Sequence, residues 1–220
     1  MVKIPTYIIG TGGLGKGVLE TIKMIDLRDR NWDLAGFIDD NIENSHVHVG
    51  GLPVVGDTDF LLTINDTSNV VIAIANPIVK EKIHKKLSTN SRLLFPNVIH
   101  PTVTLNPTVK VGYGNIISEH TAISADVEIN NFTLVHFNST IGHDIKIKDY
   151  ATIYPGGNLS GFSILGEKSQ IGSNACVLQN VKVGVSATVG AGALVNKDVC
   201  DNTTVAGVPA KLLRSEWVTT

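Results

Sequence analysis

The sequence is short of cysteine and has no excess of charge of either sign. Its only two cysteines, Cys176 and Cys200, form no CxxC pair and lie in no Cys/His cluster. This excludes a disulfide framework and a zinc knuckle, and it favours a reducing compartment. The 18 basic and 20 acidic residues give a net charge of -2 and no basic block. We therefore expect no nucleic-acid partner.

Long hydrophobic runs are also missing. No uncharged apolar stretch approaches the roughly 18 residues that a membrane span requires. The N-terminal residues, Met1 to Pro5, lead into a short apolar strand and not into the hydrophobic region of a signal peptide. We therefore expect a soluble cytoplasmic protein without a membrane span.

Aromatic residues make up only 5% of the 220 residues, whereas Ile, Leu and Val total 66 and glycine 21. A chain that is 43% hydrophobic and 17% charged is not predominantly disordered. Its length suits one large domain or two small ones. The composition predicts a core of branched aliphatic side chains with little room for rings.

The second half of the sequence repeats with a period of six residues. An Ile, Leu or Val stands at every sixth position from residue 99 to residue 195, with no insertion. A mostly small residue stands four positions after each of them, and a glycine often follows directly. The aliphatic series is Ile99, Leu105, Val111, Ile117, Ile123, Ile129, Val135, Ile141, Ile147, Ile153, Leu159, Leu165, Ile171, Val177, Val183, Val189 and Val195.

This period predicts a parallel β-helix. Six is three times the two-residue period of a strand, so the same positions of every hexad face inward. One hexad forms a short strand and a corner, and three hexads close a triangular coil. At roughly 4.8 Å a coil, the repeat would give about 5.7 coils and a prism about 27 Å tall. We interpret the glycine after the aliphatic residue as a tight turn. The alternative fold is a β-sandwich, in which the spacing between strands along the sequence would be irregular.

The first half begins with a strand, a glycine-rich turn and a helix. Residues 4–9 read as a buried strand, residues 10–15 (GTGGLG) as the turn, and residues 18–25 as part of an amphipathic helix. This arrangement presents backbone N–H groups to a phosphate. Because GxGxxG alone is a weak signal, close strand–helix packing without a ligand remains an alternative. An NAD oxidoreductase is another, but it leaves the β-helix without a role.

Further strands and a helix complete a small α/β unit. A second strand over residues 34–38 ends in Asp39 and Asp40, and an acid at that point can accept a hydrogen bond from a ribose or base. A third strand over residues 70–75 is followed by a helix to Leu87, and residues 93–95 lead toward Pro96. These elements predict a Rossmann-like domain.

Taken together, the two halves resemble the bacterial sugar O-/N-acyltransferases of the NeuD and PglD type. The resemblance implies a left-handed β-helix and a trimer with active sites between adjacent prisms. It implies a nucleotide-sugar-binding domain at residues 1–97, an acetyl-CoA-binding domain at 98–210 and a C-terminal tail at 211–220. The matching stretches are residues 8–13 (IIGTGG), 37–40 (FIDD), 54–57 (VVGD), 71–74 (VIAI), 99–101 (IHP), 141–144 (IGHD), 189–193 (VGAGA) and 207–211 (GVPAK).

In the pattern of this family, His143 occupies the position of the general base and Asp144 that of the adjacent acid. Histidine has the near-neutral pKa needed to take a proton from an attacking amine. A neighbouring carboxylate orients the ring and supports its charged form. The hexad frame places His143 two residues after Ile141, at a corner of a coil.

The resemblance also assigns the nucleotide-sugar. It implies phosphate and sugar contacts at Gly12, Gly13 and Leu14, and base or ribose contacts at the residues that follow the strands. Many members carry histidine where this chain has Leu14, so only a backbone N–H can serve here. The remaining implied nucleotide-sugar residues are Asp39, Asp40, Ile74 and His136, the last in the acceptor-sugar pocket.

For acetyl-CoA, the family pattern implies contacts along a groove of the β-helix. The matching positions are Thr152, Ser173 and Ala191, with Gly161 and Gly172 allowing the ligand to approach closely. Apart from the family pattern, Lys197, Lys211 and Arg214 are candidate partners for the CoA phosphates, and the alternative is that they are solvated basic residues.

We expect no metal cofactor. Removing one 18-residue coil shows that His120, His136 and His143 point from different parts of the triangle, so a carbonic-anhydrase-type zinc site would have to be shared across a trimer. We predict an acetyl-CoA-dependent N-acetyltransferase acting on a UDP- or GDP-linked 4-amino-4,6-dideoxy-sugar in surface glycan biosynthesis. The alternatives are O-acetylation of sialic acid or a related sugar, and a non-catalytic scaffold that senses a nucleotide.

Overall fold

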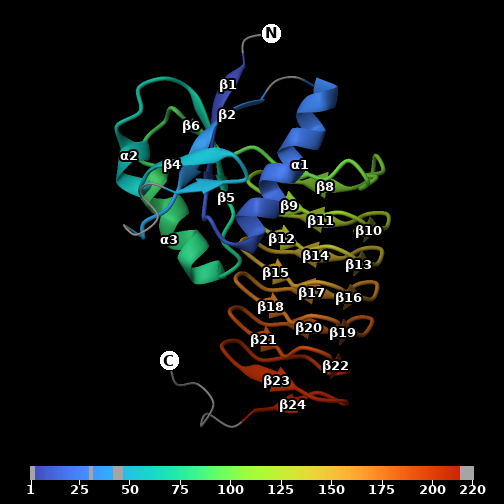
Figure 1. Ribbon diagram of the computed structural model, residues 1–220. Coiled ribbons are helices and arrows are strands. Elements are labelled where there is room, and N and C mark those ends of the chain that lie inside the picture. Colours follow the sequence, from blue (N-terminus) through green and yellow to red (C-terminus); the bar gives the residue numbers. More distant parts are fainter. Residues whose placement is uncertain (1–2, 30–31, 42–46, 214–220) are drawn as a thin grey trace. The chain divides into compact units, whose positions relative to one another are not determined.

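The computed structural model describes residues 3–29, 32–41 and 47–213, and it divides into two compact units. The N-terminal unit comprises Met1–Pro101 and Tyr113–Ile116, and the C-terminal unit comprises Thr102–Gly112 and Ile117–Thr220 (Figure 1). Within the described ranges, no helix is both long and apolar enough to cross a membrane.

The N-terminal unit is built on a six-stranded sheet in the order β3-β4-β2-β1-β5-β6. Neighbouring strands are parallel except for the β3–β4 hairpin. The predicted Rossmann-like fold is confirmed, although the third predicted strand ends at Ile72 and not at residue 75. The strands are β1 Ile4–Ile9, β2 Trp32–Ile38, β3 His48–Val49, β4 Leu52–Gly56, β5 Ser68–Ile72 and β6 Leu93–Leu94.

Three helices accompany this sheet: α1 Gly13–Asp29, α2 Thr58–Leu62 and α3 Pro77–Leu87. α3 begins where the sequence predicts, because the Asn76 side chain accepts hydrogen bonds from the N–H groups of Ile78 and Val79 and proline stands at the first helical position. The β3–β4 hairpin and α2 were not predicted. Both are too short to show a periodic pattern of their own.

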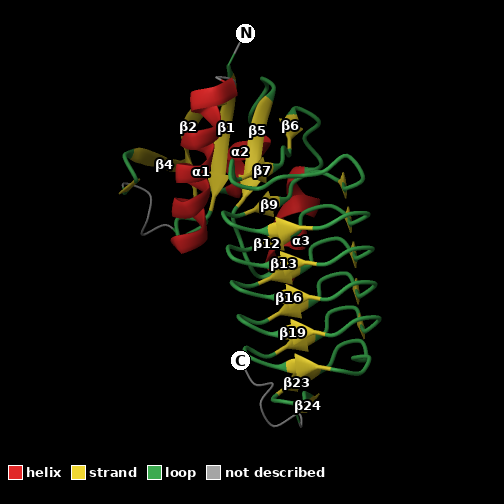
Figure 2. Cartoon of the chain, turned by 90° about the vertical axis from the view of Figure 1, so that its right-hand side faces the viewer, coloured by secondary structure: helices red, strands yellow, loops and turns green. Residues whose placement is uncertain are grey.

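The C-terminal unit contains the predicted parallel β-helix (Figure 2). Strands pair with the strand 18 residues further along, as Thr140 pairs with Asn158 and Ile141 with Leu159. One five-stranded sheet comprises β10 Ala122–Ile123, β13 Thr140–Ile141, β16 Asn158–Leu159, β19 Cys176–Val177 and β22 Leu194–Val195. The other comprises β8 Lys110–Val111, β11 Glu128–Ile129, β14 Lys146–Ile147, β17 Ile164–Leu165 and β20 Lys182–Val183.

The third sheet has eight strands in the order β24-β23-β21-β18-β15-β12-β9-β7. Its last coil is shorter than the others, since Thr188 pairs with Thr204, and β24 then returns antiparallel to β23. The strands are β7 Val98–Ile99, β9 Ile116–Ile117, β12 Leu134–Val135, β15 Thr152–Ile153, β18 Gln170–Ile171, β21 Thr188–Val189, β23 Thr204–Ala206 and β24 Lys211–Leu212.

The interior of the β-helix follows the hexad pattern. Every aliphatic residue of the series except Leu105 is the second residue of a strand, and from Ile129 onward all of them are buried. The residues four positions later are buried from Asn115 onward, with alanine, serine and threonine frequent among them. The predicted core of branched side chains beside small ones is therefore confirmed.

The interpretation of the glycine after the aliphatic residue as a tight turn is wrong. Left-handed backbone occurs two residues later than that glycine, as at Asp144 (φ 57°) and Asn174 (φ 55°). A Cβ at Gly142 would lie 2.8 Å from the nitrogen of Gly161, and one at Gly166 would lie 2.6 Å from the carbonyl carbon of Gly184. Glycine is required there because the next coil stacks too closely for a side chain.

Two core serines provide a test of this packing. The side-chain oxygens of Ser163 and Ser169 are buried without a hydrogen-bond partner among the described residues. Burying an unpaired hydroxyl is unfavourable, and alanine already occupies the equivalent position at Ala151 and Ala175. We expect Ser163→Ala to raise the free energy of unfolding by about 1 kcal/mol in a denaturant titration.

Ser139→Ala is the matched control, because the Ser139 hydroxyl donates to the carbonyl oxygen of His136 at 2.7 Å. This control should lower the free energy of unfolding by about 1 kcal/mol. Equal destabilisation by both alanine substitutions would contradict the packing argument.

Candidate active site

Each coil of the β-helix turns at three corners, and stacked coils align the corner residues in columns. Ala125, His143 and Gly161 form one column, which we call the His143 corner. The N–H of Asp144 donates to the carbonyl oxygen of Ala125 at 3.1 Å, and the N–H of Phe162 donates to that of His143 at 3.0 Å. The coils on both sides therefore fix the backbone of His143.

Three contacts hold the His143 side chain. Its Nδ1 lies 2.8 Å from Oδ2 of Asp144. The ring lies over Gly161, where a Cβ would come within 2.7 Å of both Cε1 and Nε2. Finally, the ring meets Phe162 edge to face, with the ring centroids 5.0 Å apart.

These contacts assign the two ring nitrogens. An ionised carboxylate can only accept, so the hydrogen bond to Asp144 places the proton of neutral His143 on Nδ1 and leaves a lone pair on Nε2. The His143 side chain is 52% exposed. Nε2 can therefore take a proton from a nucleophile that approaches from outside the coil.

Gly161, which the resemblance assigns to acetyl-CoA, lies next to the His143 ring. Its own N–H donates no hydrogen bond to any of the described residues, whereas the next N–H, that of Phe162, is paired. Beside Nε2, this N–H is a candidate donor to a developing oxyanion.

His136 differs from His143 in which nitrogen can accept. The N–H of Phe137 donates to Nδ1 of His136 at 3.0 Å, so the neutral ring carries its proton on Nε2. Burial lowers the pKa of His136, against a smaller opposite effect of Glu119. His136 is therefore suited to donate a hydrogen bond and not to act as a base.

Two of the expected acetyl-CoA residues share a second corner. Ser173 and Ala191 stack 18 residues apart, and the N–H of Gly192 donates to the carbonyl oxygen of Ser173 at 2.8 Å. In each coil this Ser173 corner is separated from the His143 corner by a strand of the β10-β13-β16-β19-β22 sheet. One chain therefore does not bring Ser173 and Ala191 to the corner that carries His143.

The structure gives Gly172 a packing role and buries the side chain of Thr152. A Cβ at Gly172 would lie 2.5 Å from the nitrogen of Ala191, so this glycine permits coil stacking. Thr152, in β15, has no exposed surface. In the described chain, its side chain is not available to a ligand.

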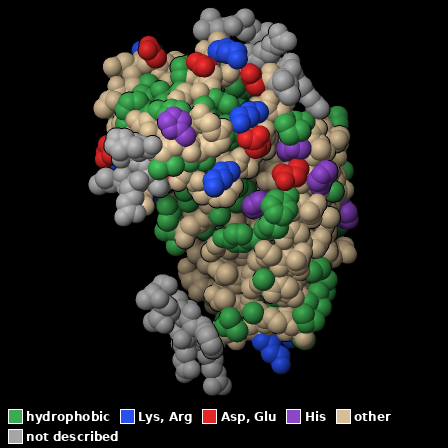
Figure 3. Space-filling view, in the orientation of Figure 1, with side chains coloured by type: hydrophobic (Ala, Val, Ile, Leu, Met, Phe, Trp, Pro, Cys, Tyr) green, Lys and Arg blue, Asp and Glu red, His purple; other side chains and the backbone are tan. Residues whose placement is uncertain are grey.

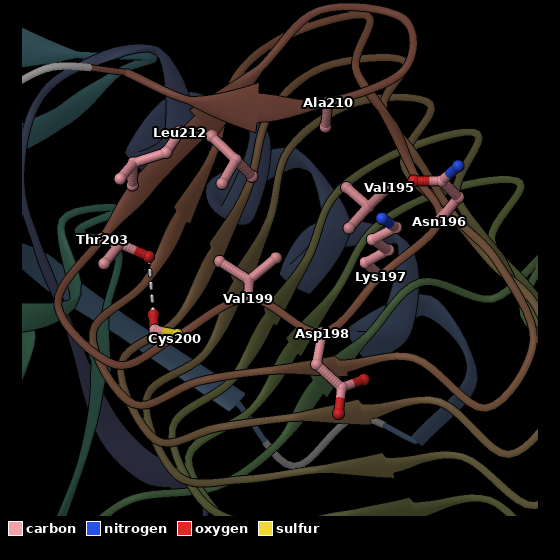
Figure 4. Close-up of a pocket in the computed structure, with 10 residues that line it drawn as sticks. Val195, Asn196, Lys197, Asp198, Val199, Cys200, Thr203, Ala210 and Leu212 are labelled. Carbon is pink, nitrogen blue, oxygen red and sulfur yellow. Dashed lines mark hydrogen bonds between the residues drawn. The ribbon is translucent and has the colours of Figure 1, made fainter.

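The basic candidates lie at the C-terminal end of the β-helix. A cavity of about 250 Å³, lined mainly by apolar side chains, opens between the last coil and β24. Figure 4 shows Lys197, Asp198 and Val199 among its lining residues, with Leu212 contributed by β24. Lys211 is exposed on β24, and Arg214 lies outside the described residues.

In the N-terminal unit, the glycine-rich turn contains two kinds of glycine. A Cβ at Gly15 would lie 1.9 Å from the carbonyl oxygen of Gly10, so Gly15 is required for the packing of α1 on β1. A Cβ at Gly12 or Gly13 would meet nothing within 4 Å. These two glycines leave open space at the N-terminus of α1, where the first N–H groups of a helix, such as that of Leu14, have no partner within the helix and favour an anion.

Ile74 and Asp39 lie at the carboxyl ends of β5 and β2, on either side of β1. The chain passes from β1 to β2 on one side and later to β5 on the other, and ligands of open α/β sheets bind at such a point. Ile74 approaches Gly10, where a Cβ would lie 2.8 Å from its Cδ1. Asp39 Oδ2 accepts from the hydroxyl of Thr11, which ties the turn to β2.

Asp40 is engaged within the chain. One carboxylate oxygen accepts from the N–H of Thr58 at 2.8 Å and the other from its hydroxyl at 3.3 Å. Since Thr58 is the first residue of α2, Asp40 fixes the start of that helix. Both carboxylate oxygens of Asp40 are thus engaged in structural contacts.

No group of three or more His, Cys, Asp or Glu side chains among the described residues is arranged to hold a metal ion. Figure 3 shows histidine side chains over the upper coils of the β-helix and few charged side chains over the lower ones.

Phe162 is a functional candidate that the sequence did not reveal, because its hexad position carries polar residues and glycine at most other corners. Its positive φ could not be read from the sequence.

Comparisons with known proteins cover both units. The PglD N-terminal domain family matches residues 6–87. GDP-perosamine N-acetyltransferase of Escherichia coli O157:H7 is 28% identical over 176 residues, which cover 79% of this chain and 78% of that protein.

Solved structures extend the similarity. The acetyltransferase domain of PglB from Neisseria gonorrhoeae, in complex with acetyl coenzyme A, has a TM-score of 0.88 and 31% identity over 96% of this chain and 100% of that one. PerB from Caulobacter crescentus, in complex with CoA and GDP-perosamine, has a TM-score of 0.85 and 29% identity over 96% of this chain and 97% of that one.

The fold and the exposed His–Asp pair define a β-helical acyltransferase with a Rossmann-like N-terminal domain. Within that class, the chain belongs to the NeuD/PglD-type family of sugar acetyltransferases.

The two kinds of glycine in the turn lead to a stability prediction. Gly15→Ala should lower the free energy of unfolding by about 1–3 kcal/mol, because its Cβ would overlap a backbone oxygen. Gly12→Ala, the control, should change it by less than about 0.5 kcal/mol. Denaturant titrations of both variants would measure this, and equal values would contradict the assignment of Gly12 to open space.

Proposed function

We propose that this protein transfers the acetyl group of acetyl-CoA to the amine of a nucleotide-linked 4-amino-4,6-dideoxy-sugar. The observation that carries the proposal is the half-exposed ring of His143, oriented by Asp144 next to Gly161, whose N–H donates no hydrogen bond to the described residues. The CoA and GDP-perosamine bound in the Caulobacter relative support the choice of donor and acceptor class.

The reaction is a direct transfer without an acyl-enzyme. The sugar amine nitrogen attacks the thioester carbonyl carbon, and its proton passes to Nε2 of His143. The C–N bond forms, the carbonyl oxygen becomes an oxyanion that the Gly161 N–H stabilises, and the C–S bond then breaks. The thiolate leaves with the proton from His143 as CoA thiol.

Asp144 acts through His143 by holding the Nδ1 proton and stabilising the imidazolium during transfer. His136, with a donor Nε2, hydrogen-bonds an oxygen of the acceptor sugar. This division gives each histidine one role that its hydrogen bonds support.

The N-terminal unit holds the nucleotide. The phosphates of the nucleotide lie in the open space beside Gly12 and Gly13, where the N-terminus of α1 attracts negative charge. Ile74 contacts the UDP or GDP base, and Asp39 accepts hydrogen bonds at the carboxyl end of β2. Leu14 contributes a backbone N–H in place of the histidine of many relatives.

Acetyl-CoA runs along the β-helix, past Ser173 and Ala191 toward Lys197 and Lys211. Because Ser173 and His143 lie at different corners of one chain, a complete site needs the His143 corner of one protomer beside the Ser173 corner of another. We therefore propose a homotrimer with three such sites. The reaction would belong to surface polysaccharide or glycoprotein-sugar synthesis in the cytoplasm.

A thiol-release assay with acetyl-CoA tests this function against a panel of UDP- and GDP-linked 4-amino-sugars, CMP-sialic acid and free sialic acid. Release only with a nucleotide-linked amine is the expected result. Release only with sialic acid would favour O-acetylation, and none with any acceptor would favour a non-catalytic role.

His143→Ala should lower kcat by at least about a hundredfold, in line with the loss of a general base. His48→Ala, which removes an exposed histidine on β3, is the control and should leave turnover unchanged. Steady-state kinetics measure both. Wild-type turnover in His143→Ala would sink the mechanism.

Gly161→Ala should lower kcat by about tenfold or more while the fold persists, because a Cβ would displace the His143 ring, which is the movable end of a side chain. Gly172→Ala is the contrasting variant. Its Cβ would meet backbone, so it should lose stability first, by about 1–3 kcal/mol. An unaltered kcat in Gly161→Ala would contradict the placement of the ring.

A further inference from the structure

Phe162 occupies an unusual position for a large aromatic residue. It follows Gly161 at the His143 corner with a φ of 62°, in the left-handed region that bulky side chains rarely adopt. The residues at the same position in the neighbouring coils, Asp144 and Asn180, are of the kinds that tolerate this backbone. Phe162 is also 46% exposed. Neither backbone preference nor burial accounts for phenylalanine at this site.

Other aromatic residues in left-handed corners have an internal explanation. Phe132 and Tyr150 stack with their ring centroids 5.6 Å apart and an interplanar angle of 12°. Phe132 is only 1% exposed, so its burial offsets the backbone strain. The ring contact of Phe162 is instead with His143, at an interplanar angle of 89°.

The position of Phe162 completes the enclosure of the His143 ring. Gly161 lies near Cε1 and Nε2 of the ring and Asp144 binds Nδ1, and Phe162 adds a third contact. A terminal imidazole torsion is broad and roughly two-fold, so an exposed ring held by a single hydrogen bond can swing or flip. An aromatic ring packed edge to face against it narrows that freedom.

We propose that Phe162 is a positioning residue, which holds the His143 ring over Gly161 with Nε2 directed outward. This inference rests on the proposed function only in taking His143 as the base. Strain at a functional corner is consistent with it, because unfavourable backbone persists where the surroundings require it.

Phe162→Asn tests the proposal, since asparagine is native to this corner position at Asn180. We expect kcat to fall about tenfold, because a misdirected base loses near-attack geometry. KM for acetyl-CoA and for the acceptor should stay within about twofold. Phe162→Tyr, which keeps the ring, should retain most of the wild-type kcat. A rise in KM with unchanged kcat would assign Phe162 to ligand contact and overturn the positioning role.

A double-mutant cycle shows whether the effect passes through His143. Phe162→Asn should have no further effect on the residual kcat of His143→Ala, so the full tenfold loss, about 1.4 kcal/mol, appears as coupling. The same tenfold loss in both backgrounds would overturn the proposal. Wild-type turnover in His143→Ala alone would instead refute the proposed function.

Structure and stability complete the test. A crystal structure of Phe162→Asn should show the His143 ring displaced from Gly161 or disordered, and an unchanged ring would overturn the proposal whatever the turnover. Tyr150→Asn removes an aromatic ring from a left-handed position at another corner. It should lower the melting temperature and leave kcat unchanged. Phe162→Asn should lower kcat and leave the melting temperature unchanged.

Discussion

The stacking of one coil on the next is the interaction on which the β-helix depends. Strands of successive coils pair in register through backbone hydrogen bonds, 18 residues apart in every coil but the last, as Thr140 pairs with Asn158. This spacing fixes the aliphatic residue inside the prism and the left-handed residue at each corner. It also forbids a side chain at positions such as Gly142, where the next coil is too close.

The candidate active site uses the same constraint. His143 stands at a corner because the hexad places it there. The next coil along the chain supplies both Gly161 and Phe162, which lie against the His143 ring. A rigid scaffold thus orients an exposed side chain with few dedicated residues. The three corners are separate, so the chemistry at one corner and the CoA contacts at another require a second copy in the proposed trimer.

The N-terminal unit divides its polar residues between structure and ligand. Asp40 fixes the start of α2 through Thr58, and Gly15 allows α1 to pack on β1. Gly12 and Gly13 satisfy no internal packing requirement, and they face open space at a helix N-terminus. This contrast supports the proposed phosphate site at the turn, because the open space lies where a helix N-terminus favours negative charge.

The sequence by itself determined the β-helix, the Rossmann-like strands around residues 4–9 and 34–38, and the corner position of His143. Those features follow from periodicity and local backbone preferences, which are properties of neighbouring residues. Only the tertiary structure decided that Gly161 faces the His143 ring, that Thr152 is buried, that Asp40 is engaged with Thr58 and that Phe162 packs against His143. The hexad period places residues in columns, but the direction of each side chain and the partners it meets depend on packing that periodicity does not fix.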